Sequence, residues 1–297
     1  MTLQLVKGSN LIKSAVSEPS SFVGRLGSTE YWVLEKNGYL NGVEAEDVSL
    51  REGISVPSRR TVARTAWTSA GIWPPTIGQQ VSFCNEYLSA LKETTVMASW
   101  GNPTVMPKEA GILKTFCPDS KIINSACLDA VWISNNGVSP WTMQLRGRKV
   151  LVVHQFDSLI NEQYRKREFL HKVEVLPEFE LFTYRPPSTQ GLNPFSRSWS
   201  YNLEKSREEL GKLIEEFKIE VALVSAGAYG MPLSHNLKKS GISTVYVGGS
   251  LQILFGIWGG RWFQRPEYQD YSTESWVWPD SNRRPFGYKV VEKSSYW

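Results

Sequence analysis

VALVSAGAYGMPLSHNLKKSGISTVYVGGSLQILFGIWGGRW, residues 221–262, contains two apolar runs that each end in a glycine turn. The first run stops at the turn 225–230, a helical stretch follows over 230–239, and the second run, 243–247, stops at Gly248-Gly249-Ser250. In a strand–helix–strand unit of this kind the two strands are parallel, so both glycine turns leave the same edge of the sheet. Open α/β sheets bind their ligands at that edge.

Further strands and helices alternate around this unit. The apolar runs predict strands over 21–25, 149–153, 179–184 and 219–225, and the polar periodic segments predict helices from residue 31, over 158–171 and over 199–217. Residues 57–95 are predicted to be mostly helical, with a break at 71–75, where two prolines follow one another. The alternation predicts a Rossmann-like α/β fold, with a largely parallel sheet and helices on both faces. We expect a single domain, 1–297, in which residues 265–297 form an irregular cover.

Composition excludes several classes of protein. The 297 residues carry a formal net charge of +4, which is too small to indicate nucleic acid, so we expect no nucleic-acid partner. The three cysteines have no metal-ligand spacing and are expected to be reduced. Neither a signal peptide nor an apolar run long enough for a membrane segment is recognisable, and we expect a cytoplasmic protein. The twelve tryptophans fit either core packing or stacking on sugar rings.

Four predicted strand ends carry groups that suit a phosphate-bearing ligand: Arg25 with Gly27 to Glu30, His154 to Asp157, Ser225 to Gly230, and Gly248 to Ser250. If these strands share one parallel sheet, their turns meet at one edge, where backbone N–H groups and positive helix ends attract anions. The glycine turns match neither the dinucleotide fingerprint nor the phosphate loop. On these grounds alone they are equally compatible with nucleotide binding and with tight helix–strand packing.

Each candidate side chain also has a structural alternative. Glu30 is either a base or metal ligand, or a carboxylate that favours the helix dipole. His154 is either a proton carrier or a packed residue, and Asp157 is either catalytic or a helix cap. Arg167 and Arg261 are either phosphate ligands or ordinary surface arginines.

Five segments of the chain resemble a widespread microbial and viral family of glycosyltransferases, and they are 152–156, 163–167, 225–233, 247–257 and 260–262. The resemblance covers most of the chain from Ser21 onward, and Trp276 and Tyr296-Trp297 also fit it. Residues 22–30 are more distantly similar to the amino-terminal region of GT-D type glycosyltransferases, whose acidic pair holds a divalent metal. Here Ser28 stands where the first acidic residue would be. A single carboxylate, Glu30, makes a weak site for Mn²⁺ or Mg²⁺.

The resemblance implies an enzyme that moves a sugar from a nucleoside diphosphate donor, with a UDP-sugar favoured, to a glycan acceptor. The catalytic candidates are Glu30, His154 and Asp157, and Glu30 is also the candidate metal ligand. The candidate ligands of the nucleotide and diphosphate are Arg25, Gly27, Arg167, Ser225, Gly227, Ala228, Tyr229, Gly230, Gly248, Gly249, Ser250 and Arg261. Trp262 and Trp276 are the candidate acceptor residues. The alternative is a non-catalytic carbohydrate- or nucleotide-binding protein that retains the fold, which the loss of the first acidic residue favours.

Overall fold

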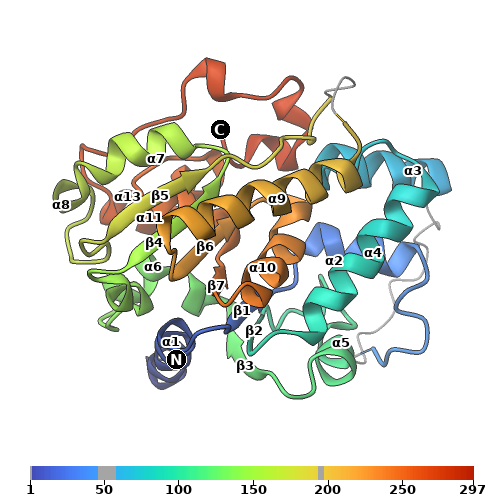
Figure 1. Cartoon of the computed structure of the whole chain (residues 1–297), viewed down its shortest axis with the longest axis horizontal. Coiled ribbons are helices and arrows are strands. Elements are labelled where there is room, and N and C mark those ends of the chain that lie inside the picture. The colour runs from blue at the N-terminus through green and yellow to red at the C-terminus, as the bar shows by residue number, and fades with distance from the viewer. Residues whose placement is uncertain (1, 46–57, 193–196) are drawn as a thin grey trace.

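A parallel sheet of seven strands, in the order β3-β2-β1-β7-β6-β4-β5, forms the centre of the computed structural model. The structure describes residues 2–45, 58–192 and 197–297 (Figure 1). The strands are β1 (Phe22–Arg25), β2 (Val96–Ser99), β3 (Lys121–Asn124), β4 (Lys149–His154), β5 (Glu180–Tyr184), β6 (Val221–Ser225) and β7 (Ser243–Tyr246). The predicted fold class, a largely parallel α/β sheet, is confirmed.

Successive residues of the central strands pack into two different hydrophobic clusters, one on each face of the sheet. In β4, Val150 and Val152 belong to the first cluster, whereas Leu151 and Val153 belong to the second. This alternation follows from the two-residue period of a strand, and it requires apolar residues at every position because both faces are covered. The unbroken apolar run therefore identifies a central strand.

Helices cover both faces. The first cluster contains residues of α1 (Thr2–Ser17), α6 (Ala130–Asn135), α7 (Asp157–Tyr164), α8 (Arg167–Leu170), α11 (Leu251–Leu254), α12 (Gly260–Phe263) and α13 (Pro266–Tyr271). The second contains residues of α2 (Ser28–Lys36), α4 (Ile77–Lys92), α5 (Glu109–Phe116), α9 (Trp199–Phe217) and α10 (Gly230–Lys239). Helix α3 (Arg59–Thr65) continues into a π-helical turn, Ala66–Ala70, whose alanines join the second cluster.

The predicted helices at 199–217 and 230–239 are confirmed, and the helical region predicted from residue 57 is divided into α3, the π-helical turn and α4. Pro57 itself lies outside the described residues. The prediction of one helix over 158–171 is wrong, because the helix is interrupted at Arg165-Lys166, between α7 and α8.

The elements that the sequence pattern did not reveal include α1, β2, β3, α5 and α6. The buried face of α1 includes Gly8, Ser9 and Ala15, so its apolar stripe is weak. Strand β3 lies at the edge of the sheet, where only one of its four residues is buried.

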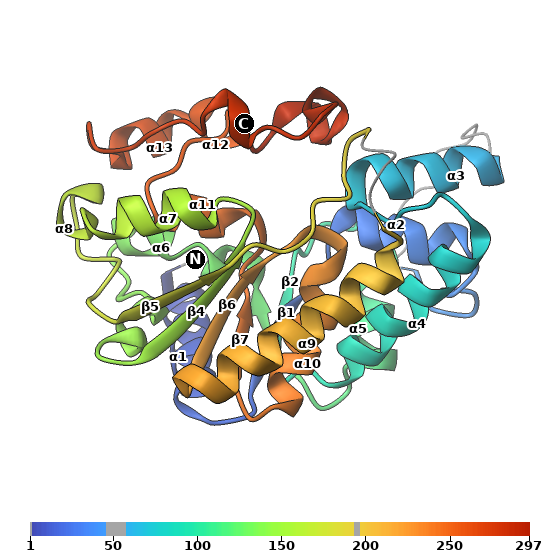
Figure 2. The same cartoon turned by 45° about the horizontal axis from the view of Figure 1, so that its top comes forward.

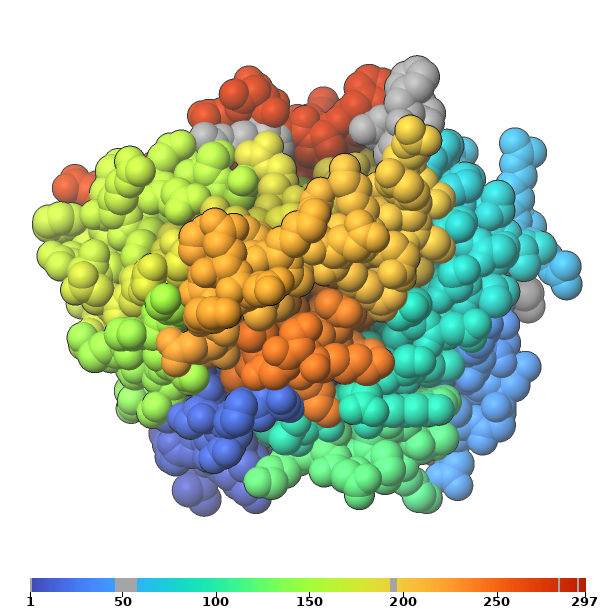
Figure 3. All heavy atoms as spheres, in the orientation of Figure 1, coloured from blue at the N-terminus to red at the C-terminus, as the bar shows by residue number. Residues whose placement is uncertain are grey.

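The C-terminal segment, residues 265–297, lies over the edge of the sheet at which the strands end (Figure 2). It contains α13 and three short 3-10 turns, and Val291 and Trp297 are buried in the first cluster. The space-filling view shows this segment capping one side of the molecule, away from the N-terminal helix (Figure 3). No helix of the described residues is both long enough and apolar enough to cross a bilayer.

Candidate functional site

A cavity of about 650 Å³ opens at the carboxyl ends of the strands. Its floor is formed where β1, β7, β6 and β4 end, and these four strands are neighbours in the sheet. His154 and Ser225 occupy paired positions at the ends of β4 and β6. Because β4 leads outward to β5 and β6 leads inward to β7, the loops that follow them diverge, which creates a crevice of the kind that binds ligands in open α/β sheets.

Arg25, the last residue of β1, is the half-buried cation of this floor. Its guanidinium lies 4.9 Å from the ring centre of Trp100 and 5.9 Å from that of Tyr246. Its Nε is buried and has no hydrogen-bond partner, and no carboxylate among the described residues forms an ion pair with it. A cation held between aromatic rings without a counter-ion is a favourable position for an anionic ligand.

Each glycine turn has a glycine with a positive φ that lies close to another side chain of the cavity. Gly248 has a φ of +70°, and a Cβ atom there would lie 2.7 Å from Nη2 of Arg25. Gly227 has a φ of +50°, and a Cβ atom would lie 2.5 Å from Nε2 of Gln190. Only glycine adopts these conformations without strain and leaves this space open. Both turns lead into helical segments, whose first N–H groups have no partner within the helix.

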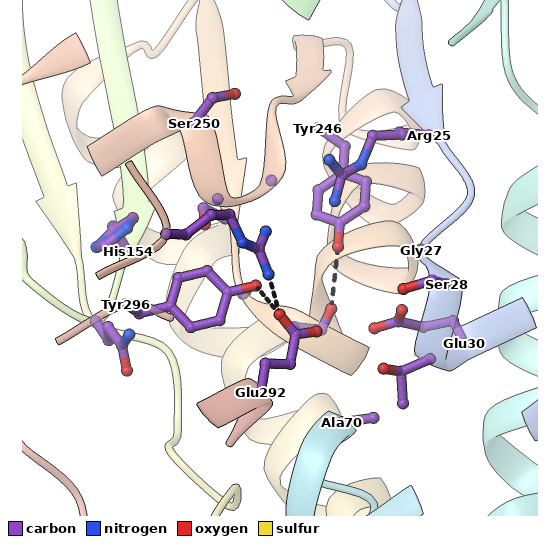
Figure 4. Close-up of a pocket in the computed structure, with 18 of the residues that line it drawn as sticks. Arg25, Gly27, Ser28, Glu30, Ala70, His154, Tyr246, Ser250, Glu292 and Tyr296 are labelled. Atoms are coloured by element: carbon purple, nitrogen blue, oxygen red, sulfur yellow. Dashed lines mark hydrogen bonds and ion pairs between the residues drawn. The ribbon is translucent and has the colours of Figure 1, made fainter. Parts of the chain in front are cut away.

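Glu30 lies in the first turn of α2 and folds back toward the start of the helix. A Cβ atom on Gly27 would lie 1.9 Å from Oε2 of Glu30, so this glycine makes room for the carboxylate. Burial raises the pKa of Glu30, the Glu292 carboxylate raises it further, and Arg25 opposes the rise. Figure 4 shows the carboxylates of Glu30 and Glu292 directed into the same space.

His154 ends β4 and is 2% exposed. Its Nδ1 accepts a hydrogen bond of 2.9 Å from the backbone N–H of Phe156, and burial lowers the pKa of the imidazole to about 3. The ring is therefore neutral near pH 7 and carries its proton on Nε2. In this state His154 can donate a hydrogen bond to a phosphate, but it has no free ring nitrogen with which to act as a base.

The C-terminal segment places Glu292 against Arg261. Nη2 of Arg261 pairs with Oε2 of Glu292, and the Tyr296 hydroxyl donates to the same carboxylate oxygen at 3.1 Å (Figure 4). The guanidinium of Arg261 also lies 5.1 Å from the ring centre of Tyr296. Arg261 is thus in the cavity, but its charge is already balanced.

Helices α6 and α13 form a separate wall of the cavity with a carboxylate of its own. Asp129 precedes α6, where its Oδ1 accepts the N–H of Trp132 at 2.9 Å, and its Oδ2 accepts the Tyr268 hydroxyl at 2.6 Å. Burial raises the pKa of Asp129 to about 6. Trp132 in α6 and Tyr268 in α13 line the cavity with Asp129.

The cavity brings together most of the residues predicted from the sequence. Those that line it are Arg25, Gly27, Glu30, His154, Ser225, Gly227, Tyr229, Gly248, Gly249, Ser250, Arg261 and Trp262, with Ser28 beside them. Five others do not line it: Asp157, Arg167, Ala228, Gly230 and Trp276.

These five residues have structural contacts of their own. Asp157 pairs with Arg185 at 2.5 Å, and Arg167 pairs with Glu178 at 3.0 Å. Ala228 is fully buried, and a Cβ atom on Gly230 would lie 2.2 Å from the ring of Tyr246. The Trp276 indole donates to a backbone carbonyl at 2.6 Å and packs 4.5 Å from the ring centre of Trp258.

Sequence reasoning did not select Trp100, Asp129, Tyr246 or Glu292, all of which line the cavity. One sequence signal could have drawn attention to Asp129, because an aspartate immediately before the apolar run 130–133 is typical of the start of a helix. No sequence signal pointed to Glu292, because the segment around it has no apolar periodicity.

The divalent metal implied by the resemblance does not fit these residues. A hard cation takes oxygen ligands, and a protein site for Mg²⁺ usually supplies one or two ionised carboxylates while phosphates and water supply the rest. At the start of α2 the chain offers one carboxylate, whose burial disfavours the anion, and the exposed hydroxyl of Ser28. In the part of the chain that the structure describes, no three His, Cys, Asp or Glu residues are grouped to hold a metal ion. We derive no step through a metal.

No model of a protein family matches the sequence, and no curated protein matches it. A solved structure described as the selenomethionine-substituted domain of unknown function 1792 is similar over 82% of each chain, with 13% identity and a TM-score of 0.38. We therefore assign the site from its own residues.

Proposed function

We propose that the protein is a glycosyltransferase that takes a sugar from a nucleoside diphosphate donor, with UDP favoured, and transfers it to a glycan acceptor. The observation that carries the proposal is the unpaired guanidinium of Arg25 at the floor of a cavity lined by two glycine turns. A diphosphate would supply the missing counter-ion and accept hydrogen bonds from the turns. The resemblance of residues 225–262 to glycosyltransferases supports the same assignment.

The other residues of the floor take complementary roles in this proposal. His154 donates from Nε2 to a phosphate oxygen, and Arg261 exchanges Glu292 for the diphosphate when the donor binds. Glu30 accepts hydrogen bonds from hydroxyl groups of the donor. In the transfer, the acceptor oxygen forms a bond to the anomeric carbon, the bond from that carbon to the diphosphate breaks, and the leaving diphosphate is stabilised by the arginines.

A non-catalytic nucleotide- or carbohydrate-binding protein is the second candidate. The observation that favours it is the ion pair of Arg261 with Glu292, which balances a charge that a transferase would direct at its leaving group.

Calorimetric titration with UDP, UDP-glucose and UDP-galactose, combined with an assay for released UDP, tests the proposal. Arg25→Met should weaken UDP binding by about 2 kcal/mol, or about thirtyfold, which is typical of losing a hydrogen bond to a charged group. Arg197→Met is the matched control, because Arg197 also lies over an aromatic ring, 5.5 Å from that of Tyr201, but does not line the cavity. Absence of binding by the wild type would exclude the transferase. Binding without release of UDP in any acceptor mixture would favour the second candidate.

A further inference from the structure

The wall formed by α6 and α13 differs in chemistry from the floor of the cavity. The floor presents Arg25, two glycine turns and a neutral histidine, which suit an anion. The wall presents the Asp129 carboxylate beside the aromatic side chains of Trp132 and Tyr268, and the exposed Arg265 also lines the cavity. Carboxylates that accept hydroxyl hydrogens, together with flat aromatic surfaces, are the groups that bind neutral sugars.

We propose that this wall is the acceptor subsite and that Asp129 takes the proton from the attacking hydroxyl of a sugar acceptor. The inference rests on the proposed function, since it assigns the second substrate of the same reaction. As the acceptor oxygen bonds to the anomeric carbon and the diphosphate leaves, the hydroxyl proton passes to the Asp129 carboxylate. Charge and atoms then balance without a further reactant.

Geometry favours Asp129 over the other carboxylates of the cavity. The Glu292 carboxylate is paired with the guanidinium of Arg261, so its negative charge is already balanced. Glu30 belongs to α2, which packs on the other face of the sheet from α6, and its side chain is folded against Gly27. Asp129 uses one lone pair of each oxygen, for Trp132 and for Tyr268, and a carboxylate has about four such sites.

The surroundings of Asp129 also suit a base that works near neutral pH. Burial raises the pKa of Asp129 to about 6, and the hydrogen bond from Tyr268 and the charge of Arg265 oppose that rise. Helix α11, which packs against α6, carries no charged residue. Helix α1 packs against the 3-10 turn before Asp129, and its Lys13 donates to the Ser139 hydroxyl at 2.9 Å. A carboxylate with this pKa is ionised at pH 7 yet remains a better base than an exposed aspartate.

Asp129→Asn tests the assignment without removing the helix cap, because the asparagine oxygen can still accept the Trp132 N–H. We expect release of UDP from UDP-glucose to fall at least about a hundredfold, with water or methyl glucoside as acceptor. UDP affinity measured by calorimetry should not change. A variant that keeps wild-type turnover, or one that folds but loses UDP affinity, would overturn the inference. Wild type that binds no UDP would instead overturn the proposed function, and this inference with it.

The pH dependence of kcat in the Tyr268→Phe variant distinguishes a catalytic base from a purely structural Asp129, because a structural role would leave this dependence unchanged. Because the Tyr268 hydroxyl lowers the pKa of Asp129, its removal should shift the acidic limb of the kcat profile to higher pH. In the wild type this limb should rise with an apparent pKa near 6. A limb at the same pH in the variant would contradict the role of Asp129 as base.

Discussion

Replacing Glu292 by glutamine is expected to tighten the binding of UDP. In the structure the Glu292 carboxylate pairs with Arg261 and accepts the Tyr296 hydroxyl at 3.1 Å. A diphosphate can use Arg261 only if it displaces this carboxylate. Glutamine keeps the shape of the side chain and an oxygen for Tyr296, but it removes the negative charge.

The size of the effect follows from the exposure of the pair. The side chains of Arg261 and Glu292 are 30% and 28% exposed, so solvent screens their attraction and the pair contributes about 1 kcal/mol. Releasing that interaction before the ligand binds corresponds to an affinity about fivefold higher.

Calorimetric titration of the Glu292→Gln variant with UDP measures this difference. The matched control is Glu178→Gln, which breaks an arginine–glutamate pair of 3.0 Å with Arg167 outside the cavity and should leave UDP affinity unchanged. Unchanged or weaker binding by Glu292→Gln would show that Glu292 does not compete with the ligand for Arg261.

Three further outcomes are expected. Gly248→Ala and Gly241→Ala, at φ of +70° and +87°, should each lose about 1 kcal/mol in urea unfolding. Only Gly248→Ala should also weaken UDP binding in calorimetry, since its Cβ would meet Arg25, whereas the Cβ at Gly241 meets nothing within 4 Å. Glu30→Gln should match the wild type in unfolding free energy below the ordinary glutamate pKa. Because burial raises the folded-state pKa of Glu30 and so destabilises its anion, the variant should become increasingly more stable than the wild type as the pH rises from the ordinary pKa to the raised one; a difference that does not depend on pH would contradict this. Trp276→Phe should lower the unfolding free energy by about 1–2 kcal/mol while UDP release stays at the wild-type rate, and a selective loss of transfer would instead place this indole at the acceptor.

The central part of the fold was predictable because its signals are local. Strands β4 and β6 are buried on both faces, so each contains a run of apolar residues that stands out in the sequence. Strand β3 was missed because three of its four residues are exposed at the edge of the sheet. Helix α1 was missed because small and polar residues occupy its buried face.

The amino-acid sequence by itself determined which strand ends are followed by groups that suit an anionic ligand. Arg25, His154 and the two glycine turns each follow an apolar run directly, and parallel strands bring their carboxyl ends to one edge. The tertiary structure alone decided which charges remain available there. Arg25 is left without a counter-ion while Arg261 receives Glu292 from a segment without apolar periodicity, and Asp129 enters the cavity from a loop beyond an unrecognised strand. The physical reason is that an ion pair or a buried carboxylate depends on packing between segments distant in the chain, which no local pattern encodes.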